Sequence, residues 1–163
     1  MDDRAREELK LRIQRCFPQA PAGPTLSLRG GNALDDYATP PPYDATLDAP
    51  TDDYIEAFHW GIHHLDPDSW LYYLPILLTY SLSQMEDGTS EAVDTFLFSL
   101  LPPDRDPPRF STLTPPQVAA VVSVLEALGF SPNSRYQDDA LQALQEYWGD
   151  VEPGGDHGST PHR

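Results

Sequence analysis

Four residues of one predicted helix have the types and the spacing of a metal site. The segment 52–64 reads as a helix, and at about 100° per residue four of its side chains fall within roughly a 60° sector: Asp52, Glu56, His59 and His63. Two imidazoles four residues apart can share one metal ion, and Glu56 lies one turn below them. The pattern indicates a metal-dependent hydrolase with Glu56, His59 and His63 as ligands of a divalent cation.

A structural interpretation of the same residues stays open beside the metal site. Acidic side chains at the start of a helix and histidines near its end complement the helix dipole, and Glu56 with His59 forms an ordinary surface pair. The chain contains no His-Glu-x-x-His, no Cys-x-x-Cys and no EF-hand calcium loop.

Other catalytic chemistries have weaker support in the sequence. A Cys–His dyad needs Cys16 beside His59 or His63, and no motif indicates that pairing. A Gly-x-Ser-x-Gly nucleophile motif is absent. The run 29–32, Arg-Gly-Gly-Asn, is similar to a glycine-rich phosphate-binding loop but lacks the P-loop lysine. A tight turn or a close backbone approach explains its glycines better.

The charge of the chain is strongly negative and unevenly distributed. There are 26 acidic and 10 basic residues, a formal net charge of −16, and from Gly30 to Asp104 fourteen Asp and Glu occur without a single Lys or Arg. Such a field repels nucleic acid and anionic membranes, and it attracts a basic protein. Acidity that only maintains solubility is the plainer alternative.

Cysteine usage and hydropathy predict a cytoplasmic protein. Cys16 is the single cysteine, which excludes an intrachain disulfide and suits a reducing compartment. The first residues lack the apolar run of a signal peptide, and the longest apolar stretch, about 70–82, is too short to cross a bilayer.

Apolar periodicity and capping residues predict an all-α protein. Helices are expected at 3–16, 27–37, 52–64, 67–82, 90–101, 115–128 and 134–148. Thr114 with Gln117 forms a capping box, and Gly129 is placed to stop that helix. We therefore expect one helical domain over 1–149 with about six to seven helices, an irregular proline-rich loop at 39–51 and a disordered polar tail at 150–163.

The segment 65–82 is expected to form the axis of this bundle. Asp66 is a good N-cap, Pro67 suits the first helical position, and the following residues are apolar on every side. A helix of that kind must be surrounded by others. Pro75 lies inside it and is expected to kink it, because proline removes one helical hydrogen bond.

This segment also carries a resemblance to known proteins. The motifs are Asp-Asp-Tyr at 35–37, Leu-Asp-Pro at 65–67, Trp-x-Tyr-Tyr-Leu-Pro at 70–75 and Phe-x-x-Leu-Thr-x-x-Gln at 110–117. Over about 25–130 the chain resembles an uncharacterised helical family of bacterial proteins, a domain of unknown function. The resemblance implies a helical fold and a bacterial setting, and it implies no activity, cofactor or catalytic residue.

Three functional hypotheses follow. The first is a non-enzymatic acidic domain that binds a protein partner of basic character, by analogy with inhibitors or immunity proteins that shield basic toxins. The second is the metal-dependent hydrolase built on Glu56, His59 and His63. The third is a structural or regulatory domain whose acidity serves no particular partner.

Overall fold

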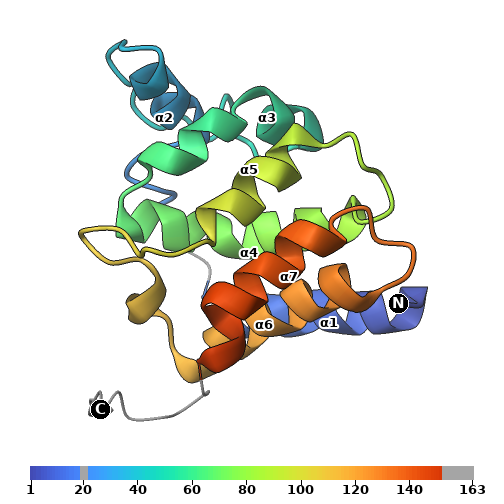
Figure 1. The fold of residues 1–163 in the computed structure, drawn as a ribbon. Coiled ribbons are helices and arrows are strands. Elements are labelled where there is room, and N and C mark those ends of the chain that lie inside the picture. The colour runs from blue at the N-terminus through green and yellow to red at the C-terminus, as the bar shows by residue number, and fades with distance from the viewer. Residues whose placement is uncertain (19–21, 152–163) are drawn as a thin grey trace, which may run out of the picture.

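Every regular element in the described part of the chain is a helix. The computed structural model describes residues 1–18 and 22–151 (Figure 1). Its α-helices are α1 (Asp3–Cys16), α2 (Leu28–Asp35), α3 (Asp52–Ala57), α4 (Pro67–Ser83), α5 (Glu91–Ser99), α6 (Pro115–Phe130) and α7 (Gln137–Glu146). Three short 3-10 helices complete the list: η1 (His59–His64), η2 (Phe110–Thr112) and η3 (Trp148–Asp150). The prediction of an all-α fold with about six to seven helices is confirmed.

Side-chain caps explain where most of these helices begin. A side-chain oxygen accepts a hydrogen bond from an amide of the first turn at each of six N-caps, which are Asp2, Ser27, Thr51, Asp66, Ser90 and Thr114. Each such bond satisfies an amide that has no partner within its own helix. The predicted capping box of Thr114 and Gln117 is present. These local signals set the starts of the helices.

Gly129 does not end α6, contrary to the sequence prediction. The helix continues to Phe130, and Gly129 is buried inside it. A Cβ at this position would lie 2.8 Å from Cδ2 of Leu141 on α7. The glycine therefore allows α6 and α7 to pack closely, which is a tertiary requirement and not a helix stop.

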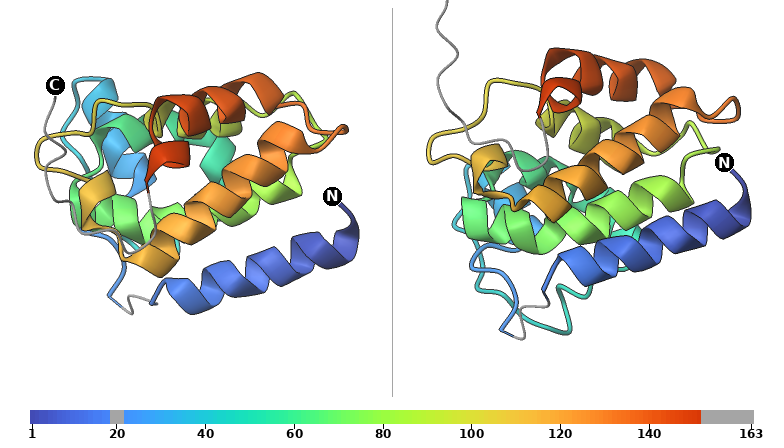
Figure 2. Two further views of the ribbon diagram at one scale, coloured as in Figure 1. Left: turned by 60° about the horizontal axis from the view of Figure 1, so that its bottom comes forward. Right: turned by 90° about the horizontal axis from the view of Figure 1, so that it is seen from below.

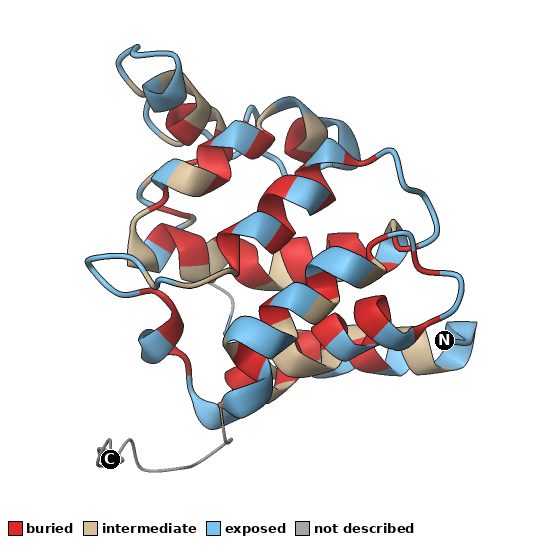
Figure 3. Ribbon diagram, viewed as in Figure 1, coloured by how far each residue is buried: buried red, intermediate tan, exposed pale blue. Residues whose placement is uncertain are grey.

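The core forms where α4 packs among its neighbours α1, α5 and α6. In both views of Figure 2, α1 and α7 lie on opposite sides of the molecule, with α4 and α6 between them. Trp70, Tyr73, Leu74 and Leu78 of α4 have no exposed surface, and the buried faces of the helices turn toward this centre (Figure 3). Burial of these large side chains is the main favourable term in folding.

One side of α4 is more open than its sequence predicts. Tyr72, Ile76 and Thr79 are only half-buried, and they line a groove of about 620 Å³ between α1 and the start of α3. Ile13 of α1 and Phe17, the residue that follows this helix, form part of the facing wall. The helix is thus covered on most sides but is not enclosed. Pro75 lies within α4 and also lines this groove.

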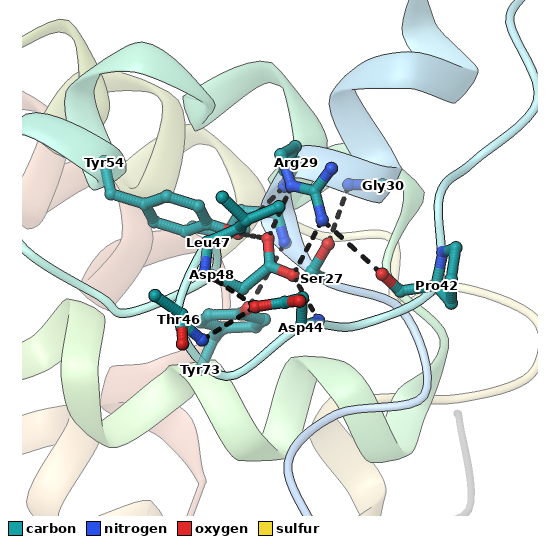
Figure 4. A network of polar contacts seen from close by, with 11 residues as sticks. Ser27, Arg29, Gly30, Pro42, Asp44, Thr46, Leu47, Asp48, Tyr54 and Tyr73 are labelled. Carbon is teal, nitrogen blue, oxygen red and sulfur yellow. Dashed lines mark hydrogen bonds and ion pairs between the residues drawn. The ribbon is translucent and has the colours of Figure 1, made fainter.

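The proline-rich loop 39–51 is irregular, as predicted, but it is held by a buried carboxylate. The side chain of Asp48 is fully buried and accepts two hydrogen bonds from Arg29, Nε at 2.9 Å and Nη2 at 3.1 Å. Tyr54 donates its hydroxyl at 2.8 Å, and the amide of Asp44 donates at 2.8 Å (Figure 4). The loop is therefore fastened to α2 and α3 through one side chain.

Helix α2 crosses η1 through a contact of two glycines. A Cβ added to Gly31 would lie 2.5 Å from the carbonyl oxygen of Gly61, and one added to Gly61 would lie 2.1 Å from that of Leu28. No larger residue fits between backbones at these distances. The sequence offered a tight turn or a close backbone approach as the reason for the glycines of 29–32, and the structure shows the close backbone approach.

The C-terminal boundary differs from the predicted one. The last α-helix spans Gln137–Glu146 instead of 134–148, and η3 follows it. Asp150 belongs to η3, and Val151 packs against the core. The remainder of the predicted tail, 152–163, lies outside the described residues. Among the described residues, none of the helices has the length and hydropathy needed to span a membrane.

Candidate functional site

The helix that was expected to carry the metal ligands is not one continuous α-helix. Helix α3 ends at Ala57, Phe58 leaves the helical conformation (φ −119°, ψ 23°), and residues 59–64 form η1. A 3-10 helix has three residues per turn, so residues four apart no longer lie on the same face. The prediction that Glu56, His59 and His63 lie on one face of a single helix is therefore wrong.

Glu56 binds the start of α5. The hydroxyls of Tyr80 and Ser90 both donate to its Oε1, and the amide of Ala92 donates to Oε2 at 3.3 Å. A carboxylate at the N-terminus of a helix is stabilised by the helix dipole and by free amides. Glu56 thus joins α3 to α4 and α5.

The two histidines have different environments. His59 is buried, its Nδ1 shares a hydrogen bond of 2.7 Å with Oγ1 of Thr95, and its Nε2 lies 3.4 Å from a carboxylate oxygen of Glu91. His63 packs edge-on against Phe98, with ring centroids 6.0 Å apart. Within residues 1–18 and 22–151, no three His, Cys, Asp or Glu side chains are grouped as metal ligands.

Elemental analysis tests the metal hypothesis directly. Because both oxygens of Glu56 and both ring nitrogens of His59 already have protein partners, we expect tag-free protein to contain no stoichiometric zinc or manganese. A metal content near one equivalent, lost in both His59→Ala and His63→Ala, would restore the hydrolase hypothesis. The His59→Ala variant is expected to lose stability as well, since it leaves Thr95 without its buried partner.

A hollow lies beside η1. Its volume is about 480 Å³, and three elements form it: η1, α5 and α7. The lining includes the aromatic residues Trp60, His63 and Phe98, the carboxylates Asp94 and Asp139, and Gln142. Trp60 and Phe98 are 51% and 66% exposed, so two large aromatic side chains present apolar surface in the same hollow. We call this hollow the η1–α5–α7 pocket.

The electrostatics of the η1–α5–α7 pocket are negative. Burial raises the pKa of Asp94, and the charges of Asp139, Glu91 and Glu56 raise it further. Burial, followed by the positive charge of Arg105, lowers the pKa of His63 below its ordinary 6.5, so this imidazole is neutral at pH 7. The pocket therefore presents carboxylates whose mutual repulsion a bound cation would relieve.

Two arginines fix the position of η1, which carries two of the aromatic walls. Arg105 donates Nη1 to the carbonyl of His63 at 2.6 Å, and the buried Arg109 donates Nη2 to the carbonyls of Ile62, at 3.3 Å, and Leu65. Burial and the nearby Arg105 lower the pKa of Arg109 to about 10. The end of a helix favours such cations because its last carbonyls are unpaired.

Asp104 in turn folds the loop that carries these arginines. Its Oδ1 accepts the amides of Arg105 at 2.8 Å and Arg109 at 2.9 Å, and both carboxylate oxygens accept the amide of Phe110, at 3.1 and 3.0 Å. A carboxylate that accepts hydrogen bonds from several backbone amides holds an irregular loop in one conformation. The loop between α5 and η2 is thereby fixed against η1.

Of the residues that line the pocket, His63 was predicted from the sequence as a candidate, but in a different role. Trp60, Phe98 and Asp139 were missed because they come from three elements that are far apart in the sequence. One local signal existed for Phe98, since it lies off the apolar stripe of Val93, Phe96, Leu97 and Leu100, all of which are buried. An exposed aromatic side chain indicates a contact surface where it joins others in one patch, as Phe98 does with Trp60 and His63.

Comparison with known proteins identifies a family but no activity. A family model described as a family of unknown function (DUF6714) matches residues 5–152, which is most of the chain. No curated protein and no solved structure matches the chain.

Proposed function

The chain belongs to DUF6714, a family of unknown function, and we propose that it is a non-enzymatic protein-interaction domain that binds a basic partner at the η1–α5–α7 pocket. One observation carries this proposal: two exposed aromatic side chains, Trp60 and Phe98, lie beside the carboxylates of Asp94 and Asp139. In the described part of the chain, neither carboxylate forms an ion pair.

The aromatic residues account for affinity in this proposal. Tryptophan and other large aromatic side chains are enriched among the residues that contribute most to binding energy in protein interfaces. When a partner covers the exposed side chains of Trp60 and Phe98, their apolar surface is removed from water, which favours binding. The pocket between them gives the partner a concave surface to fill.

The charge accounts for the choice of partner. A net charge of −16 raises the association rate of basic proteins and repels phosphate backbones and anionic lipid. The Debye length in physiological salt is about 8 Å, and attraction between exposed charges over longer distances is screened. Association is therefore expected to slow as the salt concentration rises. A domain of this type would act as an inhibitor or an immunity-like protein by covering a basic surface of its partner.

Site-specific photo-crosslinking tests the proposal. A photoreactive amino acid at position 142, which is exposed and lines the pocket, is expected to capture a basic protein in the native host. The same amino acid at position 11 is the control, because Leu11 is exposed on α1, on the opposite side of the molecule from α7 (Figure 2). Capture at position 142 is expected to fall several-fold between 50 and 300 mM salt.

A pair of neighbouring aspartates provides the matched variants. Asp138 and Asp139 both lie in the first turn of α7, but only Asp139 lines the pocket. Asp139→Asn is expected to reduce the capture at position 142 several-fold, whereas Asp138→Asn, with the same change in net charge, leaves it nearly unchanged. Equal capture at positions 11 and 142, or capture of acidic proteins, would contradict the proposed function.

A further inference from the structure

The walls of the η1–α5–α7 pocket combine two kinds of surface that one chemical group satisfies together. Trp60, His63 and Phe98 supply aromatic surface from η1 and α5, and the ring centroids of Trp60 and His63 are 6.2 Å apart. Asp94 supplies a carboxylate from α5, and Asp139 supplies another from α7. A planar cation can stack on the aromatic side chains and form ion pairs with the two carboxylates.

We propose that the η1–α5–α7 pocket binds an arginine side chain of the partner, with the guanidinium against Trp60 and paired with Asp94 and Asp139. This inference rests on the proposed function, and it names the group that the pocket recognises. Guanidinium is planar, weakly hydrated and rich in donors, so it suits a site that is both aromatic and acidic. Lysine offers a compact, strongly hydrated charge and stacks less well.

The surrounding polar groups fit the same ligand. The side-chain amide of Gln142 lines the pocket and supplies an oxygen acceptor for a further N–H of the guanidinium. His63 adds no competing positive charge at neutral pH, because its pKa is lowered by burial and by Arg105. A volume of about 480 Å³ also leaves room for the residues that flank the arginine.

Tryptophan fluorescence gives a direct measurement of binding. The chain has three tryptophans, and Trp70 and Trp148 are buried at 0% and 1% exposure, so a bound peptide changes mainly the emission of Trp60. The full chain is titrated with acetyl-Gly-Arg-Gly-amide and with the same peptide containing lysine or citrulline. Citrulline keeps the shape of arginine but removes its charge.

We expect the arginine peptide to bind about tenfold more tightly than the citrulline peptide and about threefold more tightly than the lysine peptide. Asp139→Asn is expected to weaken arginine binding about fivefold, and Asp138→Asn to change it less than twofold. Phe98→Ala, which keeps Trp60 as reporter, is expected to weaken it as well. Trp60→Phe removes the fluorescence change and identifies its source.

Equal affinity for arginine and citrulline peptides would overturn this inference. So would equal weakening by Asp138→Asn and Asp139→Asn, because binding would then follow net charge alone. Neither result would contradict the capture of a basic partner at position 142, because a partner can cover the pocket without inserting an arginine side chain into it. Loss of that capture, by contrast, overturns the proposed function whatever the peptides do.

Discussion

Replacement of Asp48 by asparagine is expected to lower the free energy of unfolding by about 2 kcal/mol. The carboxylate is fully buried, and it accepts two hydrogen bonds from Arg29 and one from Tyr54. Asparagine keeps the shape but leaves the guanidinium facing a neutral amide. Removal of one partner from a fully buried ion pair costs roughly 3–5 kcal/mol, and we expect less here because the Arg29 side chain remains 23% exposed to water.

Urea denaturation measures this effect as a shift in midpoint at an unchanged slope. Asp36→Asn is the control, since Asp36 is exposed at the end of α2 and the variant makes the same change in charge. We expect the control to stay within about 0.5 kcal/mol of the parent protein. If both variants lose the same stability, net charge and not the buried pair is responsible.

The same pair makes a prediction about pH. Burial alone would raise the pKa of Asp48, but the hydrogen bonds from Arg29, the Asp44 amide and Tyr54 outweigh it and hold the pKa below its ordinary 3.8. The stabilisation is therefore complete above pH 3.8 and is lost as the pH falls through the lower, folded-state pKa. The stability difference between the parent protein and Asp48→Asn is expected to shrink over that range, and a constant difference would show that the carboxylate charge is not the cause.

The starts of the helices could be predicted because their causes are local. Asp66 and Pro67 begin α4 as expected, and the capping box of Thr114 and Gln117 begins α6. The errors occur where a distant segment decides the conformation. The predicted helix 52–64 is interrupted at Phe58 in a region where α2 crosses the following residues, and Gly129 serves its contact with Leu141 instead of ending α6.

The candidate site could be predicted only in its general character. The acidic composition favours a basic partner, and the segment 52–64 supplies two residues of the η1–α5–α7 pocket, Trp60 and His63. The metal hypothesis depended on α-helical spacing, which fails once residues 59–64 form a 3-10 helix. The pocket itself could not be predicted without the fold, because its two carboxylates, Asp94 and Asp139, come from different helices, α5 and α7.

Replacement of Gly61 by alanine is expected to have a larger effect than loss of the Asp48 pair. The new Cβ would lie 2.1 Å from the carbonyl oxygen of Leu28 and 2.9 Å from the amide nitrogen of Asn32. Both are backbone atoms of α2, so no side-chain rotation relieves the overlap, and α2 must move away from η1. We expect a loss of about 3 kcal/mol or more in the free energy of unfolding, a large share of the roughly 5–15 kcal/mol of a typical domain.

Gly88→Ala is the matched control for this variant. Gly88 is exposed, and an added Cβ would lie 3.2 Å from Cβ of Arg135, a side-chain contact that a small shift relieves. We expect its stability to change by less than about 1 kcal/mol, because alanine also reduces the entropy of the unfolded chain. A partner variant, Gly31→Ala, places its Cβ 2.5 Å from the carbonyl oxygen of Gly61 and is expected to be destabilised like Gly61→Ala.

The Gly61 variant also connects the fold to the site. Trp60 and His63 flank Gly61 on η1, so a displacement of η1 from α2 moves two walls of the η1–α5–α7 pocket. Where Gly61→Ala still folds at low temperature, its affinity for the arginine peptide is expected to fall several-fold, while Gly88→Ala keeps the affinity of the parent protein. Unchanged binding in a destabilised Gly61→Ala would mean that the glycine crossing maintains the fold without positioning the pocket.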